Sequence, residues 1–360
     1  MAVKQLDATH QKFRGHLGSG KWTLCVGAGL SRGIVPTWLE LTRRLVNETF
    51  GTGLSEDDFK NIVSESAWSL DSWIQSCANH YQLTGRATSE FFDLIEKHLY
   101  SDLRTRGRSA GLEGILVNVL DRPRNASRED VARVCEFFER EYATSSLLAV
   151  VRVLLDAVKH DRLPEAIVSF NADTLLHTLF ELYQRNEHYR DPPPHSHPKY
   201  VLKTVLRPLD STKERVPVYH CHGAIKPKPA AGALEPRDSR DRLVFLESEY
   251  IRVATVASSW AETLFMFHAQ TTSMLFFGFS MSDPNMRRWL ALSNQSALQD
   301  LNAMTGLKEM TPHHIWLTTE PAASGLMTLR DEALVHLGVR PGWMKDWSQT
   351  EVAIRNLLAL

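Results

Sequence analysis

The stretch Trp22-Thr-Leu-Cys-Val-Gly-Ala-Gly-Leu-Ser31 decides the fold of this 360-residue chain. Its first five residues form a compact apolar run, which predicts a buried β-strand. A glycine turn follows at 27–31, and a helix is predicted from Pro36, because proline is favoured in the first turn of a helix. A strand, a glycine turn and a helix in this order open a doubly wound nucleotide-binding sheet. Taken alone, the turn fits a phosphate cradle and a plain tight turn equally well.

The composition is that of an ordinary globular protein, with 43% hydrophobic and 23% charged residues. Lys and Arg total 41 and Asp and Glu total 42, so the net charge of -1 does not indicate direct nucleic-acid binding. No apolar run approaches the roughly 18 residues that span a bilayer. The four cysteines are scattered without a C-x-x-C pair, which suits reduced thiols and offers no zinc site. We therefore expect a cytoplasmic protein with no membrane partner and no zinc.

The alternation of elements predicts an α/β protein with a Rossmann-like, doubly wound and mostly parallel sheet. After the opening unit, residues 55–160 show the three- and four-residue apolar spacing of helices. Strands are predicted again at 165–170, 216–220, 272–278 and 314–318. We expect a Rossmann-like domain made of 1–54 and 161–335, a helical insertion or small second helical domain at 55–160, and a helical tail at 336–360.

Polar side chains follow the strand predicted at 165–170. Asn171 and Asp173 lie just past its carboxyl end, where open α/β sheets bind ligands. Asp173 alone is better explained as the cap of the helix that follows, since aspartate is favoured there. Asn171 has no such structural explanation, and the pair is therefore a candidate binding site.

Two histidines lie at the end of the strand predicted at 216–220, in the segment His220-Cys-His-Gly223. Strand alternation directs both to one side until the glycine turns the chain away. A metal site that also uses His195 and His197 is an alternative, but no carboxylate or cysteine spacing supports it. We expect one catalytic histidine instead, and His222, next to the glycine, is the candidate.

A further turn, Gly278-Phe-Ser280, ends the strand predicted at 272–278. Its small residues suit close contact with a ribose or a phosphate. The alternative is an ordinary turn from strand to helix, with Ser282 or Asp283 as the helix cap and Pro284 in the first helical position.

These four motifs occur in one order: Gly-Ala-Gly-Leu-Ser at 27–31, Phe-Asn-x-Asp at 170–173, His-Gly at 222–223 and Gly-Phe-Ser at 278–280. Together they resemble the sirtuin family over roughly 15–50 and 160–320. The resemblance implies a Rossmann-like core that binds NAD+. It assigns the NAD phosphates to Gly27, Ala28, Gly29 and Ser31, the nicotinamide ribose to Asn171 and Asp173, catalysis to His222, and the adenosine half to Gly278 and Ser280.

Two features separate the chain from the protein deacylases of that family. Deacylases carry a zinc module built from two C-x-x-C pairs, which this chain lacks, and Trp38-Leu39 stands where they have Phe-Arg. The phrases Phe-Asn-Ala-Asp-Thr-Leu-Leu, Tyr-His-Cys-His-Gly and Gly-Phe-Ser-Met-Ser-Asp-Pro-Asn look closer to the sirtuin-like NADases of bacterial anti-phage defence. This resemblance implies a homo-oligomer, or a partner such as a HerA-type ATPase, an Argonaute-like protein or a nucleotide sensor.

The leading hypothesis is hydrolysis of the nicotinamide–ribose bond of NAD+. Asn171 would orient water and the ribose hydroxyls, Asp173 would place the ribose, and His222 would act as general base with a pKa of ~6.5. Two alternatives stay open: deacylation or ADP-ribosyl transfer to another acceptor, and a non-catalytic module that binds NAD or ADP-ribose. An unregulated NAD hydrolase would deplete its own cell. We therefore expect gating by assembly or a trigger, through the helical block or the loop at 224–241.

Overall fold

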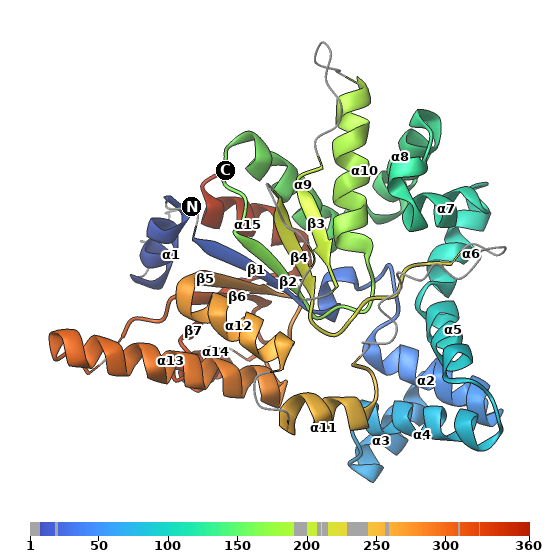
Figure 1. Cartoon of the computed structure of the whole chain (residues 1–360), viewed down its shortest axis with the longest axis horizontal. Coiled ribbons are helices and arrows are strands. Elements are labelled where there is room, and N and C mark those ends of the chain that lie inside the picture. The colour runs from blue at the N-terminus through green and yellow to red at the C-terminus, as the bar shows by residue number, and fades with distance from the viewer. Residues whose placement is uncertain are drawn as a thin grey trace.

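A single seven-stranded sheet forms the centre of the molecule (Figure 1). The computed structural model describes residues 8–18, 21–190, 200–206, 210, 215–228, 244–255, 259–308, 310–323 and 325–360. The strands are β1 (Trp22–Val26), β2 (Ala166–Ser169), β3 (Leu202–Val205), β4 (Val216–His220), β5 (Ser273–Phe277), β6 (His314–Thr319) and β7 (Val339–Met344). They lie in the order β3-β4-β2-β1-β5-β6-β7, and each neighbouring pair is parallel. The prediction of an α/β, Rossmann-like doubly wound sheet is confirmed.

The register brings the carboxyl ends of the central strands to one level. Val26 of β1 pairs with Ser169 of β2 on one side and with Phe277 of β5 on the other. His220, the last residue of β4, also pairs with Ser169. The strands β2 to β4 lie on one side of β1 and β5 to β7 on the other, so the order in which strands are added to the sheet reverses at β1. Such switch points are where open α/β sheets bind ligands. The segments that follow these four residues therefore meet at one edge of the sheet.

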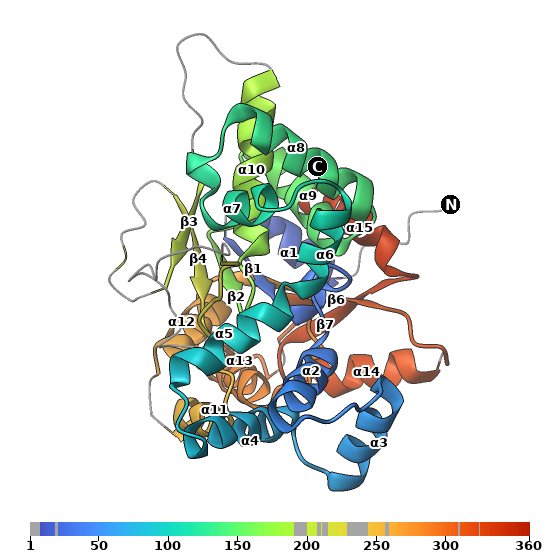
Figure 2. The ribbon, with the colours of Figure 1, turned by 90° about the vertical axis from the view of Figure 1, so that its right-hand side faces the viewer.

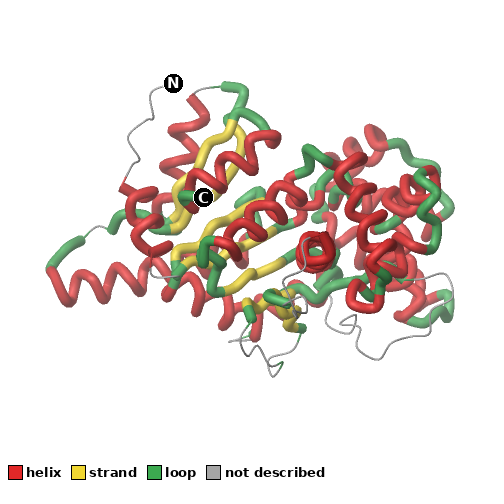
Figure 3. Tube along the Cα trace, turned by 90° about the horizontal axis from the view of Figure 1, so that it is seen from above, coloured by secondary structure: helices red, strands yellow, loops and turns green. Residues whose placement is uncertain are grey.

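Helices cover both faces of the sheet (Figures 2 and 3). On one face α9 (Ser146–Lys159) packs against α10 (Leu175–Arg190) and α15 (Thr350–Leu358), and on the other α12 (Trp260–Thr271) packs against α13 (Pro284–Thr305). Each face has its own hydrophobic core, because successive side chains of a strand point to opposite faces. α1 (Ala8–Gly18) packs against α15, β1 and β6, and α14 (Gly325–Val335) packs against β7. α2 (Trp38–Phe50) and α11 (Glu247–Thr255) pack against α4 (Leu70–Leu83). In the described part of the chain, no helix is both long and apolar enough to cross a membrane.

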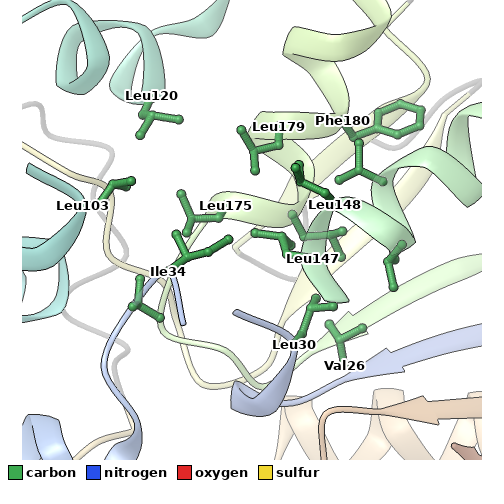
Figure 4. Packing of buried hydrophobic residues seen from close by; sticks show 14 of the residues in the cluster. Val26, Leu30, Ile34, Leu103, Leu120, Leu147, Leu148, Leu175, Leu179 and Phe180 are labelled. Carbon is green, nitrogen blue, oxygen red and sulfur yellow. The ribbon is translucent and has the colours of Figure 1, made fainter. Parts of the chain in front are cut away.

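Residues 55–160 form α3 to α9, and all of these helices except α9 lie beside the sheet, toward the right of Figure 1. The block contains α3 (Glu56–Ser66), α4 (Leu70–Leu83), α5 (Thr88–Leu99), α6 (Ser101–Ser109), α7 (Ile115–Asp121), α8 (Arg128–Tyr142) and α9. Its hydrophobic core is continuous with that of the sheet, because Leu103 and Leu120 belong to the same buried cluster as Val26 and Leu30 (Figure 4). This shared core fixes the block to the edge of the sheet where the strands end.

Two edge strands, β3 and β7, differ from the sequence-based prediction. The tail at 336–360 was expected to be helical, and the structure places β7 there before α15. Its sequence, Val339-Arg-Pro-Gly-Trp-Met344, contains proline and glycine, which disfavour a strand except at an edge, where one side needs no partner. β3 has only four residues and likewise occupies an edge. Short edge strands carry little local signal, because pairing with a distant neighbour stabilises them.

Buried neutral histidines predict that acid destabilises the fold. Burial lowers the pKa of His220, His268 and His313 to about 4 each. Below pH ~6.5 the unfolded chain protonates these rings while the folded chain does not, so the free energy of unfolding falls as the pH falls. We expect a loss of about 1.4 kcal/mol per pH unit for each histidine between pH 6 and 5. Urea unfolding at several pH values measures this change in the free energy of unfolding.

The variant His268→Gln tests the contribution of a single histidine, because it removes one of these rings. Its unfolding free energy should depend less steeply on pH than that of the wild type, by about one histidine's share. Equal stability of the wild type at pH 7 and pH 5 would contradict the prediction.

Candidate active site

The two glycine turns that follow β1 and β5 pack directly on each other. Gly29 N–H donates to the carbonyl of Gly278 at 2.9 Å, and Gly27 N–H donates to that of Phe277 at 2.9 Å. A Cβ at Gly27 would lie 2.7 Å from the Gly278 carbonyl oxygen, and a Cβ at Gly29 would lie 2.9 Å from the same atom. Glycine is therefore required at both positions for contact between the turns, which is a structural need apart from any ligand.

A cavity of about 500 Å3 opens beside this contact, and we call it the His222 cavity. Six of the predicted site residues line it: Gly27, Ala28, Asp173, His222, Gly278 and Ser280. Aromatic side chains form much of its wall: Trp38, Phe170, Phe245, Tyr250 and Phe279. Its described lining includes aspartates and no lysine or arginine. The cavity therefore suits a planar group and favours positive charge.

A second cavity, of about 600 Å3, adjoins the first at the glycine turns, and we call it the arginine cavity. It shares Ala28, Trp38, Gly278, Phe279 and Ser280 with the His222 cavity, and Gly29 lines it as well. Arg32 and Arg106 line it, and no ion pair of either guanidinium is found among the described residues. Part of its wall comes from α8 and the start of α9, namely Glu141, Tyr142, Thr144, Ser145 and Ser146. This cavity suits an anion.

Asp173 combines a structural role with a place in the site. Its Oδ1 accepts a hydrogen bond from Leu175 N–H at 2.9 Å, so it holds the first turn of α10, as the capping alternative proposed. The side chain also lines the His222 cavity and is only 5% exposed. Burial raises the pKa of its carboxyl group, and the bond from the Leu175 amide opposes that rise.

Asn171 and Ser31 are buried next to the cavities without lining them. Asn171 is 3% exposed, while its neighbours Phe170 and Ala172 line the His222 cavity. Within the described residues, Asn171 Oδ1 has no hydrogen-bond partner. Buried polar atoms are nearly always paired, so an unpaired oxygen beside a cavity is unusual.

His222 faces the His222 cavity between two aromatic rings. Its ring centroid lies 4.9 Å from that of Phe170 and 5.5 Å from that of Tyr250, with edge-to-face geometry. Burial lowers the pKa of His222 to about 4, and the negative charge of Asp283 opposes the shift. The expectation of a pKa of ~6.5 is therefore wrong, because the ring is withdrawn from water. At neutral pH the imidazole is uncharged and can accept a proton.

The other histidines do not join His222. His220 faces away, with its Nε2 3.4 Å from Nδ1 of His177 on α10. β4 ends at His220, and Gly223 N–H donates to the His220 carbonyl at 3.1 Å, so a turn begins between the two histidines and they do not share a side. His195, His197 and residues 229–241 of the predicted loop lie outside the described residues. Among the described residues, no group of three or more His, Cys, Asp or Glu side chains is arranged to hold a metal ion.

Three ionisable residues of the His222 cavity were not predicted as site residues: Asp71, Tyr250 and Asp283. Tyr250 on α11 donates a hydrogen bond to Asp283 Oδ2, and Asp283 Oδ1 caps α13 by accepting from Met286 N–H at 2.9 Å. Asp71 comes from α4 in the helical block, and burial, followed by the charge of Asp283, raises its pKa to about 6. The sequence marks Asp283 as a cap, but a lone aspartate in a helical pattern gives no signal of a distant site.

The fold is a doubly wound α/β sheet, and the His222 cavity lies at its switch point, where proteins of this class bind ligands. Residues 165–337, just under half of the chain, match the family model of the SIR2-like domain. A search of curated proteins finds no sequence that matches the chain. The match supports a sirtuin-like family, and because SIR2-like domains bind NAD+, it supports NAD-dependent activity in general. It covers the candidate residues from Asn171 to Ser280, and the glycine turn at 27–31 lies outside it.

The contact between the two turns predicts that Gly278→Ala destabilises the protein. Gly278 has φ of 75°, and a Cβ there would lie 2.5 Å from Leu30 N and 2.6 Å from the Gly27 carbonyl oxygen. The backbone conformation alone costs about 1–3 kcal/mol for a residue with a side chain, and the clash adds to it. Thermal unfolding should show a lower Tm. Gly53→Ala is the control, since its Cβ meets nothing within 4 Å. Equal melting of both variants would contradict the prediction.

Proposed function

We propose that the chain is an NAD+ glycohydrolase, which cleaves the bond between nicotinamide and ribose with water. The observation that carries the proposal is the opposite charge character of the two cavities that meet at Gly278–Ser280. The carboxylates and aromatic walls of the His222 cavity suit the cationic pyridinium ring of NAD+. Arg32 and Arg106 in the arginine cavity suit its diphosphate. If a dinucleotide lies across the shared turn, its pyridinium ring is near the carboxylates and its diphosphate is near the arginines.

The buried polar atoms and the size of the cavities support a bound dinucleotide. Each cavity lies within the range of roughly 300–1,000 Å3 that is typical of ligand sites. Asn171 Oδ1, which has no partner in the described part of the chain, is an acceptor for a ribose hydroxyl. Its neighbours in the chain, Phe170 and Ala172, line the His222 cavity, and this closeness supports the assignment.

The chemistry required of the site is modest. The C–N bond to nicotinamide breaks, its electron pair returns to the pyridinium nitrogen, and nicotinamide leaves as a neutral molecule. Positive charge develops on the ribose, and water adds to the anomeric carbon while one of its protons is removed. The products are nicotinamide, ADP-ribose and a proton, so neither an oxidant nor a reductant is needed.

The residues divide this work by position and charge. His222, neutral at pH 7, accepts the proton of the attacking water. Asn171 orients the ribose hydroxyls and the water, and Asp173 holds the ribose and stabilises the positive charge that develops on it. Asp71 and Asp283 add negative charge on the nicotinamide side of the cavity. The low dielectric of a partly buried cavity strengthens these interactions.

Replacement of the proposed catalytic residues provides the direct test. His222→Ala and Asn171→Ala should each reduce nicotinamide release from NAD+ by about 10²–10⁴-fold, because general acid–base help and orientation are lost. Chromatography of NAD+ incubated with each purified variant measures the products. His160→Ala is the control, because this exposed ring lies at the end of α9 and bonds to the Asp156 carbonyl of its own helix.

The same assay separates this proposal from its alternatives. Wild-type protein given NAD+ alone should form nicotinamide and ADP-ribose, whereas an obligate transferase or deacylase needs an acceptor. A non-catalytic module would bind NAD+ in calorimetry and form no product. Wild-type turnover in both catalytic variants would contradict the residue assignment.

Asp71 predicts a pH dependence of NAD+ affinity. Its pKa of about 6 means that the carboxylate gains its negative charge as the pH rises from 5.5 to 7.5, and a negative charge attracts the pyridinium cation. KM for NAD+ should therefore fall over this range. Asp71→Asn should weaken affinity about tenfold at pH 7.5 and flatten the profile. Asp57→Asn is the control, since this carboxylate is 94% exposed. A profile that Asp71→Asn leaves unchanged would contradict the assignment.

We further propose that the protein depletes NAD+ as an effector of bacterial anti-phage defence, gated by assembly or by a partner such as a HerA-type ATPase. The resemblance of Phe170-Asn-Ala-Asp-Thr-Leu-Leu176 and Gly278-Phe-Ser-Met-Ser-Asp-Pro-Asn285 to NADases of that kind supports this proposal. Size-exclusion chromatography with light scattering measures self-assembly. NAD+ turnover with and without each candidate partner measures gating, and constant turnover by a monomer under all these conditions would contradict it.

A further inference from the structure

Tyr100 connects the helical block to both loops of the proposed active site. It is the junction residue between α5 and α6, and its side chain is completely buried. Its hydroxyl donates a hydrogen bond to the Ile225 carbonyl at 2.6 Å and accepts one from Thr174 N–H at 3.4 Å. Thr174 follows Asp173 directly, and Ile225 comes three residues after His222. One hydroxyl therefore holds the backbone of both loops.

The two loops are also bonded to each other at this point. Ile225 N–H donates to the Ala172 carbonyl at 2.7 Å, and Asp173 and Ile225 form an isolated parallel bridge. The Tyr100 hydroxyl completes this junction from the side of the helical block. Burial raises the pKa of Tyr100, so the hydroxyl keeps its proton and remains a donor.

A second set of contacts holds the chain that follows His222, residues 223–228, which we call the strap. The carboxylate of Glu96, 5% exposed, accepts a hydrogen bond from Lys228 N–H at 2.7 Å. Arg104 donates to the Lys228 carbonyl at 3.1 Å and also pairs with Glu96. The Lys228 ammonium lies 2.5 Å from a carboxylate oxygen of Asp93. The strap is therefore fixed to α5 and α6 at its far end, as it is through Tyr100 at its middle.

We infer that Tyr100 is a positioning residue through which the helical block sets the placement of Asp173 and His222. Displacement of the α5–α6 junction from the sheet breaks both bonds of its hydroxyl and frees the two loops together. Tyr100 does not touch the substrate itself, and the block controls turnover through the bonds of this side chain to the two loops. A signal that moves α5 and α6 therefore reaches the site. This inference rests on the proposed hydrolysis of NAD+.

The energetic basis is the cost of unpaired buried groups. Without the hydroxyl, the Thr174 N–H and the Ile225 carbonyl lose a partner inside a region closed to water, which favours local opening of the loops. A displacement of about 1 Å in a catalytic group can reduce a rate about 100-fold. The substrate is held mostly by other residues of the two cavities, so binding should change less than turnover.

Tyr100→Phe tests this inference, with Tyr183→Phe as the matched control. The Tyr183 hydroxyl donates to the Cys135 carbonyl at 3.3 Å, so the control loses a buried bond between α10 and α8, away from both loops. We expect Tyr100→Phe to lower kcat about 10- to 100-fold while KM changes less than about twofold. Tyr183→Phe should keep wild-type kcat. Equal kcat in the two variants would overturn the inference.

Hydrogen exchange read by mass spectrometry gives a readout that does not depend on turnover. Exchange at 171–175 and 223–228 should be faster in Tyr100→Phe than in the wild type, and unchanged there in Tyr183→Phe. Glu96→Ala, which frees the strap at Lys228, should speed exchange at 223–228 and lower kcat even if Tyr100→Phe does not fold. Unchanged exchange and kcat in Glu96→Ala would also overturn the inference.

The two proposals fail in distinguishable ways. Wild-type protein that binds NAD+ and releases no nicotinamide under any condition defeats the proposed function, and the exchange data still report on the junction. If the wild type hydrolyses NAD+ but Tyr100→Phe has the same kcat and hydrogen exchange as Tyr183→Phe, only the role of Tyr100 is defeated.

Discussion

The direct packing of two glycine turns is the constraint on which the site depends. Gly29 N–H bonds to the Gly278 carbonyl at 2.9 Å, and neither Gly27, Gly29 nor Gly278 has room for a Cβ. Because β1 and β5 are parallel and in register, this contact closes the edge of the sheet at its switch point. Both cavities open at this backbone junction and share its residues. The geometry of the site therefore follows from backbone contact before any side chain is considered.

Charge separation between the cavities follows from which elements supply their walls. The aspartates of the His222 cavity come from three places: the loop after β2, α4 of the helical block, and the cap of α13. The arginines of the other cavity come from the glycine turn and from α6. The helical block thus contributes Asp71 to one cavity, and Arg106 and Glu141 to the other. A sheet without this block would keep the loops and lose one of three aspartates and one of two arginines.

Burial decides the chemistry of the ionisable groups at this edge. Withdrawal from water keeps His222 neutral at physiological pH, whereas it moves the pKa of Asp71 up to about 6, toward that range. The same effect keeps the Tyr100 hydroxyl protonated as a donor at the junction of the loops. A site that depends on neutral and partly buried groups needs close packing around it, and the core shared between block and sheet provides that packing.

The sequence by itself determined the central strands, the glycine turn and the positions of Asn171, Asp173 and His222 at strand ends, because apolar runs and turn residues act locally. Parallel pairing then required those ends to meet, so most of the candidate site could be predicted. Only the tertiary structure decided the edge strands β3 and β7, which are stabilised by a distant neighbour. It alone also placed Asp71 and Tyr100 beside the site and lowered the pKa of His222. Burial and the approach of charges from remote segments depend on packing in three dimensions, which no local pattern records.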